Sequence, residues 1–375
     1  MKKLLKILKW LAIIVALLAL AAWTFINFHP VFGGKPDEGS LKRIQASKAY
    51  NRALGKFENQ EPTPLITSDY KPSLWNWVAR MFESQQGQSP ATPMPTVPLA
   101  ADAMQKNGNI VWFGHSTVLF RLDNQTFLTD PVFYNASPLP LVGINPFKMT
   151  HRHSISELPP IDVVLISHDH YDHLDYRSIP KIDRIAKRFI VPLGVKAHLT
   201  RWGVDANKIT EMDWDERTQA GNTQITLVPA RHFSGRTMNE RDITLWGGYV
   251  IQAPDLKYYY SADSGYGKHY AAIAAQHAPF DLVMIENGAY DDNWAFIHEK
   301  PEETLQALHD LGGKKVLPIH WGKFDMANHG WKEPITRLLN DVQGQPEIQF
   351  ATPKIGQVFN VNEPLPQEKW WQGVE

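Results

Sequence analysis

The feature that most constrains this chain is an apolar stretch that leads directly into a cluster of histidines and aspartates. Residues 162–167 read D-V-V-L-I-S and predict a buried strand, and H-D-H-Y-D-H follows at 168–173. Two histidines two residues apart, followed by Asp and His, place four potential ligands in one loop at the end of the strand. Imidazole and carboxylate at such spacing suit zinc and similar divalent metals. We therefore predict a metal-binding loop, because a solvent-exposed His-rich loop is not expected to complete this pattern.

Composition narrows the chemistry further. The chain has no cysteine, which excludes disulfides, thiolate ligands and thiol nucleophiles and leaves only histidine and carboxylate as metal ligands. Its net charge is −1 and its basic residues are scattered, so the stripe that nucleic-acid binding needs is not expected. At 375 residues with 43% hydrophobic content, the chain suits one large domain or two small ones.

The N-terminus predicts a membrane anchor. Four lysines in the first nine residues precede a run at 10–28 that is apolar except for Thr24 and Asn27, close to the length that spans a bilayer. Basic residues before the run place the N-terminus in the cytoplasm and the remainder on the exported side. The alternative is a signal peptide cleaved near Ala19-Leu20-Ala21, which would give a secreted protein.

Three segments are expected in all: an anchor at 1–28, an accessory helical region and linker at 29–108, and a main domain at 109–375. Helices are predicted at 40–54 and 73–82 of the accessory region, with Trp75 and Trp77 packing on the main domain. In the main domain the alternation of short β-rich runs with helices predicts an α/β protein built as a four-layer αββα sandwich. The strands are expected at 110–113, 117–122, 127–129, 162–167, 223–229, 245–252, 258–261, 282–285 and 315–319. The helices are expected at 176–188, 270–276, 301–311 and 333–342.

The motif H-x-H-x-D-H after a strand resembles the metallo-β-lactamase superfamily. The resemblance implies that His168 and His170 hold a first metal and that Asp172 and His173 hold a second. Three further family ligands then have matches at predicted strand ends: His232 on the first metal, Asp263 bridging both, and His320 on the second. Asp130, in F-L-T-D-P, matches the carboxylate that supports the histidine loop without binding metal. The resemblance implies two Zn²⁺, with iron or manganese as alternatives.

Further motifs resemble one branch of the superfamily, N-acylphosphatidylethanolamine-hydrolysing phospholipase D, over roughly residues 109–360. They include G-H-S-T-V-L-F at 114–120, I-S-E-L-P-P-I-D at 155–162, L-W-G-G at 245–248, D-S-G-Y at 263–266 and I-H-W-G at 319–322. The hydrophobic N-terminus departs from that branch. L-ascorbate-6-phosphate lactonase is a more distant relative that shares the metal motifs.

The resemblance implies a dinuclear hydrolase in which a metal-bridging hydroxide attacks phosphorus or a carbonyl carbon, with Asp263 holding both metals. His115 and His298 are candidate catalytic residues, for substrate contact or for protonating the leaving group. Arg236 is a candidate phosphate ligand and Tyr290 a candidate pocket residue. The favoured function is a phospholipase D-type phosphodiesterase acting on N-acylphosphatidylethanolamine-like phospholipids at the bilayer. The alternatives are a lactonase or β-lactamase-like hydrolase of a small cyclic ester or amide, and a non-catalytic metal-binding envelope protein. No oligomeric state is predicted.

Overall fold

The computed structural model describes residues 2–68, 87–138, 143–237 and 240–375. The helix expected at 73–82, with Trp75 and Trp77, lies outside the described residues. Within them, the main domain is built on two seven-stranded sheets, each mixed in strand direction.

The first sheet has the strand order β16-β3-β4-β5-β6-β7-β8. Its strands are β3 (Asn109–Trp112), β4 (Val118–Leu122), β5 (Gln125–Thr129), β6 (Ile161–Leu165), β7 (Ala186–Pro192), β8 (Ile209–Met212) and β16 (Val358–Asn360). The second sheet has the order β15-β14-β13-β12-β11-β10-β9. Its strands are β9 (Arg217–Ala220), β10 (Thr223–Val228), β11 (Gly248–Gln252), β12 (Lys257–Tyr260), β13 (Leu282–Glu286), β14 (Lys315–Ile319) and β15 (Gln349–Phe350).

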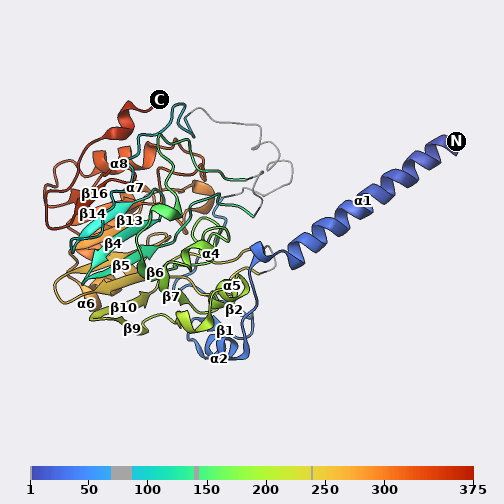
Figure 1. The fold of residues 1–375 in the computed structure, drawn as a ribbon, viewed down its shortest axis with the longest axis horizontal. Helices are drawn as coiled ribbons and strands as arrows, with labels where there is room; N and C mark the ends of the chain where they lie inside the picture. Colours follow the sequence, from blue (N-terminus) through green and yellow to red (C-terminus); the bar gives the residue numbers. More distant parts are fainter. Residues whose placement is uncertain (1, 69–86, 139–142, 238–239) are drawn as a thin grey trace.

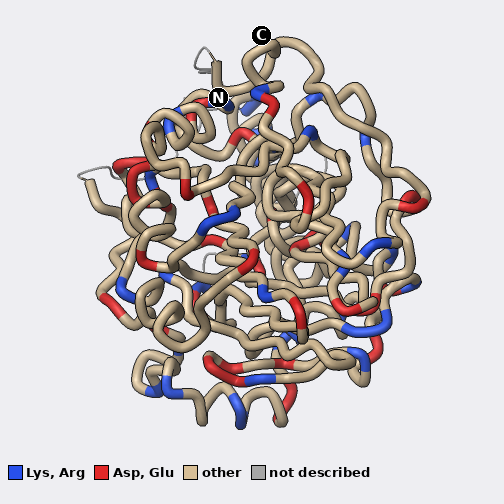
Figure 2. The backbone as a smooth tube through the Cα atoms, turned by 90° about the vertical axis from the view of Figure 1, so that its left-hand side faces the viewer, with Lys and Arg blue, Asp and Glu red and all other residues tan. Residues whose placement is uncertain are grey.

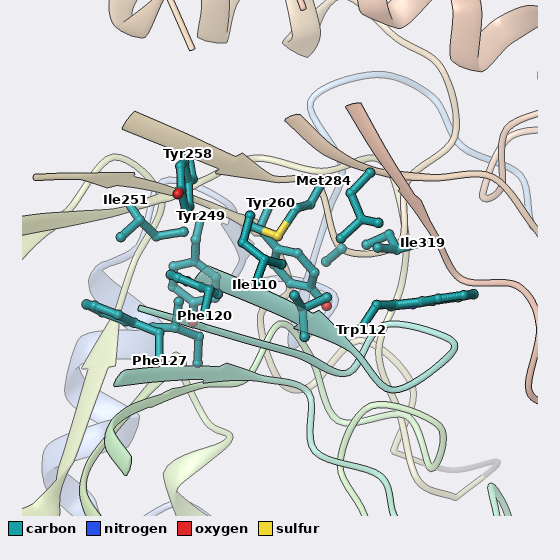
Figure 3. Packing of buried hydrophobic residues seen from close by; sticks show 14 of the residues in the cluster. Ile110, Trp112, Phe120, Phe127, Tyr249, Ile251, Tyr258, Tyr260, Met284 and Ile319 are labelled. Carbon is teal, nitrogen blue, oxygen red and sulfur yellow. The ribbon is translucent and has the colours of Figure 1, made fainter. Parts of the chain in front are cut away.

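The two sheets pack face to face because alternate side chains of each strand point to opposite faces. Phe120 and Phe127 of the first sheet meet Tyr258 and Tyr260 of the second in one buried cluster (Figure 3). Phe120 stacks on Phe127 and meets Tyr258 edge to face, with ring centroids 5.1 and 5.6 Å apart. This aromatic layer fixes the relative position of the two sheets and therefore of the loops at their ends.

Helices cover both outer faces, which completes the αββα sandwich expected from the sequence (Figure 1). Ile182 of α4 (Ile179–Ile182) and Leu199 of α5 (Lys196–Arg201) belong to the cluster outside the first sheet. Three helices cover the second sheet: α6 (His269–His277), α7 (Pro301–Leu311) and α8 (Glu333–Asp341). Helix α7 has the bounds expected at 301–311, with proline in its first turn and Gly312 at φ 65° as its C-cap.

Two predicted helices were wrong in extent. The helix expected at 176–188 is reduced to the single turn of α4, and β7 begins at Ala186. Strand β7 pairs in parallel with both β6 and β8, so its backbone hydrogen bonds are made within the sheet. The helix expected at 40–54 is α2 (Glu38–Ala46), capped at its start by the Asp37 side chain, and it gives way to the small hairpin β1 (Tyr50–Asn51) and β2 (Lys56–Phe57).

The N-terminal helix α1 (Lys2–Phe28) projects away from the rest of the chain (Figure 1). None of its residues is buried, and its mean hydropathy of 2.4 over an 18-residue window makes it a candidate membrane span. Its last residue, Phe28, and the segment 29–34 dock on α5 and on Trp202, the C-cap of α5. Arg201 donates to the Phe28 carbonyl at 2.8 Å, the Trp202 indole donates to the Pro30 carbonyl at 2.6 Å, and the Gly34 amide donates to His198 at 3.0 Å.

Apart from the four lysines at the start of α1, charges of both signs are mixed along the described chain. Figure 2 shows lysine and arginine positions interspersed with aspartate and glutamate positions rather than gathered in a stripe.

Candidate metal centre

The predicted ligands lie on loops that leave the ends of strands in both sheets. The 168–173 loop follows β6, His232 follows β10, Asp263 follows β12 and His320 follows β14. Strands β12 to β14 run parallel, so their carboxyl ends meet at one edge, where α/β proteins commonly build their sites. The loops from the other sheet meet them there.

The structure brings His168, His170 and His232 together as the first group of donors. The Nε2 atom of His168 lies 2.8 Å from Nδ1 of His170, and Nε2 of His232 lies 3.2 Å from the same atom. These three side chains can offer nitrogen atoms to a single ion.

A second group consists of Asp172, His173 and His320, with His115 beside them. Oδ2 of Asp172 lies 3.2 Å from Nε2 of His173, 3.5 Å from Nε2 of His320 and 2.9 Å from Nε2 of His115. His115 was expected to contact substrate or to protonate the leaving group; its side chain is only 2% exposed and its ring centroid is 4.0 Å from that of His320. It therefore belongs to the interior of this group.

Asp263 lies between the two groups. Its Oδ2 atom is 3.0 Å from Nε2 of His173 and 2.9 Å from Nε2 of His320, and it is 3.9 and 3.7 Å from Nε2 of His168 and His232. A single carboxylate oxygen thus reaches imidazoles of both groups, as a carboxylate shared by two ions would.

The donor set fits divalent metal ions. Nε2 of His173, Nε2 of His320 and Oδ1 of Asp263 are buried and make no hydrogen bond within the chain, although their neighbours are close. Buried polar atoms without partners are costly, and nitrogens that face a carboxylate without hydrogen-bond alignment are oriented as ligands around a common point. His173 and His320 also hold the pKa of Asp263 well below its usual range in spite of its burial, so this side chain is a carboxylate, the form that binds metal.

Asp130 is the centre of a buried hydrogen-bond network beneath the loop. It accepts hydrogen bonds from the Ser167 amide at 2.8 Å, the Ser167 hydroxyl at 2.6 Å, His173 Nδ1 at 2.7 Å and the Tyr260 hydroxyl at 2.6 Å. The contact with His173 Nδ1 fixes the ring so that Nε2 faces the second group. This is the supporting position that the sequence predicted for Asp130, and its effect on metal binding stays a prediction.

His298 lies at the edge of the cluster, with ring centroids 5.1 Å from those of both His232 and His320. Its Nδ1 atom pairs with Glu286, and its side chain is 12% exposed, against 0–1% for the side chains of His168, His173, His232 and His320. Burial lowers the pKa of His298 to about 3, so the imidazole is neutral at pH 7. Sequence reasoning missed Glu286, because a glutamate at the end of an apolar strand carries no motif of its own.

Arg236, expected to bind phosphate, has its guanidinium engaged by backbone carbonyls. It donates to Asp169 O at 2.6 Å, within the ligand loop, to Leu174 O at 2.9 Å, just after the loop, and to Val31 O at 3.0 and 2.9 Å. The residue is 4% exposed and lies over the Tyr171 ring. Arg236 therefore ties the segment that follows α1 to the ligand loop.

Tyr290, expected to line the pocket, packs against Glu333 and His329. Its hydroxyl donates to Glu333 at 2.8 Å and its ring stacks on His329 with centroids 4.3 Å apart. The neighbouring Gly288 lies closer to the cluster: a Cβ atom there would come within 2.2 Å of the His320 carbonyl oxygen, so no larger residue fits.

Several residues of the strand-end loops adopt positive φ without being glycine. They are His115 at 54°, Asp130 at 35°, Ala262 at 55°, Ala289 at 56° and His320 at 68°. The turns that aim these loops into the cluster therefore lie in the left-handed region of the backbone map.

A groove of about 430 Å³ reaches the first group of donors at His232 and Phe233. One wall comes from the accessory region, including Phe57 and Leu65, and another from Arg241 and Trp246 of the main domain. Asn59 joins the walls, since its side chain donates to the His232 carbonyl at 2.7 Å and accepts from the His232 amide at 3.1 Å. The accessory region thus completes the surroundings of a predicted ligand.

Comparison with known proteins agrees with this architecture. The profile of the β-lactamase superfamily domain matches residues 125–321, just over half of the chain. The chain therefore belongs to the β-lactamase superfamily, as a hydrolase of the metallo-β-lactamase fold, and that fold implies a divalent metal at the His/Asp cluster.

Two curated relatives extend the similarity over nearly the whole chain. An uncharacterized protein of Mycobacterium tuberculosis is 36% identical over 373 residues, which cover 95% of this chain and 96% of that protein. N-acyl-phosphatidylethanolamine-hydrolyzing phospholipase D 1 of Caenorhabditis elegans is 27% identical over 346 residues, covering 87% of this chain and 96% of the relative.

Among solved structures, CmlA, a diiron beta-hydroxylase from Streptomyces venezuelae, shares the fold at a TM-score of 0.53 and 20% identity. The match covers 68% of this chain and 54% of that one, so this chain corresponds to about half of the hydroxylase.

Proposed function

We propose that this protein is a two-metal phosphodiesterase of the phospholipase D type, acting on N-acylphosphatidylethanolamine-like phospholipids. The observation that carries the proposal is the position of the Asp263 carboxylate within 4 Å of imidazoles from both donor groups. The phospholipase D relative from Caenorhabditis elegans, similar along most of its length, supports the choice of substrate class.

The proposed ligands are His168, His170 and His232 for one ion and Asp172, His173 and His320 for the other, with Asp263 shared. We propose zinc for both ions; iron and manganese bind the same donor types. When bound, the metals would make a water acidic enough to supply a nucleophile at neutral pH and would neutralise charge on the phosphate.

The chain's own residues supply the remaining chemistry. Hydrolysis joins the water oxygen to phosphorus and breaks the bond from phosphorus to the head-group oxygen, which must gain a proton. We propose His298 as the residue that faces this oxygen, since it combines proximity to both groups with an exposed edge. Burial raises the pKa of Glu286 well above its usual range, so Glu286 donates to Nδ1 as a protonated carboxyl and the ring proton of the neutral His298 lies on Nε2, which points outward. Nε2 can then give this proton to the head-group oxygen while Nδ1 takes up the proton of Glu286. His115, paired with Asp172 in the interior, would instead orient that carboxylate.

We propose that α1 attaches the protein to a membrane in the orientation expected from its lysines, with the N-terminus cytoplasmic and the main domain exported. Twenty-seven residues of helix span about 40 Å, enough to cross a bilayer. We also propose the division into an anchor at 1–28, an accessory region at 29–108 and a catalytic domain at 109–375, with the accessory region forming one wall of the groove beside His232.

The test uses the full chain, loaded with zinc, in phospholipid nanodiscs that contain N-acylphosphatidylethanolamine. We expect release of phosphatidic acid and the N-acylethanolamine. Asp263→Asn should abolish release while the protein stays folded, and the exposed Asp255→Asn serves as the matched control. Turnover of lactones but not of phosphodiesters by the metal-loaded protein would instead identify a lactonase. No turnover of any of these substrates with two metals bound would refute a hydrolytic role.

A further inference from the structure

A second cavity, of about 420 Å³, lies apart from the histidine cluster, and none of the proposed ligands lines it. Six of its ten lining residues are apolar: Pro93, Phe113, Phe133, Pro146, Phe147 and Met149. Its size falls in the range of pockets that hold small organic ligands. Nothing in the proposed reaction uses this cavity.

The polar lining of the cavity is entirely basic. Lys148, Arg152, His153 and Lys323 line it, and no aspartate or glutamate is among its described lining residues. Lys148 and Arg152 are exposed, whereas Lys323 is only 5% exposed. Four basic side chains thus face one apolar space from the segment 148–153 and from residue 323.

Lys323 is the buried member of this set. Its ammonium donates to the Val132 carbonyl at 2.7 Å, and no carboxylate of the described residues lies within ion-pair distance of it. Burial lowers the pKa of Lys323 to about 7; the charge of Asp175 opposes this effect and that of Arg152 adds to it. A buried cation beside a second cation is destabilised unless a negative group joins them.

We propose that this cavity binds an amphiphilic anion, a carboxylate or phosphate monoester joined to a hydrocarbon body. Lys323 and Arg152 hold the anionic group, and the rings of Phe113, Phe133 and Phe147 enclose the apolar part. An anion there pairs with both cations, and the apolar body removes aromatic surface from water. A neutral ligand would leave the cations unpaired, and an inorganic anion would leave the apolar walls in contact with water. The proposal is independent of which bond the metal centre cleaves.

Met149 gives a direct readout because it lines the cavity. The full chain, labelled with ¹³C at its methionine methyls and placed in phosphatidylcholine nanodiscs, is titrated with octyl phosphate, octanoate, inorganic phosphate and octanol. Substitution of Met149 with leucine assigns its resonance, and Met284, buried between the sheets, is the internal reference. We expect octyl phosphate and octanoate to shift the Met149 signal to saturation without moving that of Met284. Phosphate and octanol should each bind at least about tenfold more weakly, because phosphate lacks the hydrocarbon part and octanol lacks the anionic group.

Variants separate specific binding from partition into an apolar space. Arg152→Gln should weaken octyl phosphate binding about tenfold, as expected for loss of one charged partner. Arg152 is exposed, so this variant is expected to fold, and Lys323→Leu provides a second, more severe change. The exposed Arg184→Gln makes the same charge change away from the cavity and should bind as the unaltered protein does.

An unmoved Met149 signal, equal binding of octanol and octyl phosphate, or unchanged binding in Arg152→Gln would each overturn the proposal. Nanodiscs that contain phosphatidic acid distinguish the two sources of the anion. A Met149 shift that phosphatidic acid nanodiscs cause without any added soluble ligand identifies a membrane lipid as the ligand. A shift with soluble octyl phosphate but not with phosphatidic acid identifies a soluble amphiphile.

Discussion

Replacing Asp130 with asparagine tests the idea that this buried carboxylate holds the ligand loop in place. Three donors converge on Oδ2: the Ser167 hydroxyl, His173 Nδ1 and the Tyr260 hydroxyl. The Ser167 amide donates to Oδ1. Asparagine keeps the shape of the side chain but turns one of the two acceptors into a donor, so it cannot satisfy all four partners.

The structure gives a magnitude for this change. With the asparagine oxygen in the Oδ2 position, its amide faces the Ser167 N–H, and one buried hydrogen bond becomes a donor–donor contact at a cost of about 1–3 kcal/mol. The other three bonds lose their charge assistance, at roughly 0.5–1 kcal/mol each. The expected loss is about 4 kcal/mol in the free energy of unfolding. Because His173 is no longer oriented, metal affinity should fall about 10- to 100-fold.

Urea unfolding of the metal-free protein measures the first quantity, and competition with a chromophoric chelator measures the second. Asp255→Asn is the matched control, because Asp255 is exposed and the same change there should alter stability by less than about 0.5 kcal/mol. If Asp130→Asn were as stable as this control and bound zinc with unaltered affinity, the supporting role of Asp130 would be refuted.

Three further predictions concern the anchor contact, the metals and pH. Arg236→Met should destabilise the protein by about 3 kcal/mol by leaving carbonyls of Val31, Asp169 and Leu174 without donors, whereas Arg201→Met, with one carbonyl contact, should cost under about 1 kcal/mol; equal losses in urea unfolding would contradict this ranking. Chelation should lower the thermal unfolding midpoint by roughly 5 °C and zinc should restore it, because a ligand of the folded state stabilises that state; an unchanged midpoint in calorimetry would argue against bound metal. Lys323 has a pKa lowered to about 7 in the folded protein from 10.5, so the unfolded chain binds the extra proton between these values and this group contributes stability that rises with pH across that window. Relative to Lys323→Met, the unaltered protein should therefore gain stability between pH 7 and 10, and parallel pH profiles from urea unfolding would contradict the assignment.

The parts of the fold that the sequence predicted correctly are those in which local pattern and tertiary role coincide. The run 162–167 is apolar because β6 is buried between β5 and β7, and the polar loop begins where the strand ends. The sequence also predicted the positions of Asp263 and His320 after strands, because both residues follow apolar runs. The sandwich was confirmed, and the seven proposed ligands lie together, although metal binding by each of them stays a prediction.

The errors arose where distant contacts decide the outcome. The segment 176–188 has helical spacing, but its last residues belong to β7, which pairs with β6 on one side and β8 on the other. The sheet therefore satisfies the backbone hydrogen bonds of these residues, and the helix ends before them. Arg236 follows a ligand motif and so resembles a phosphate-binding residue. Its acceptor at Val31 is 205 residues away in the chain, and no local pattern reports such a contact.

The left-handed turns around the cluster have a consequence for how the protein responds to change. Each alanine held at positive φ costs about 1–2 kcal/mol that glycine would not. Ala262 directly precedes Asp263, and Ala289 lies in the loop after β13, next to Gly288, which contacts His320. A substitution to glycine at either alanine can make the molecule more stable while it loosens the backbone beside a proposed ligand. Selection for heat resistance alone would favour glycine at these two positions, and metal binding would weaken as a result. Selection for activity would keep both alanines and would have to find its stability elsewhere, for example in the aromatic layer between the sheets.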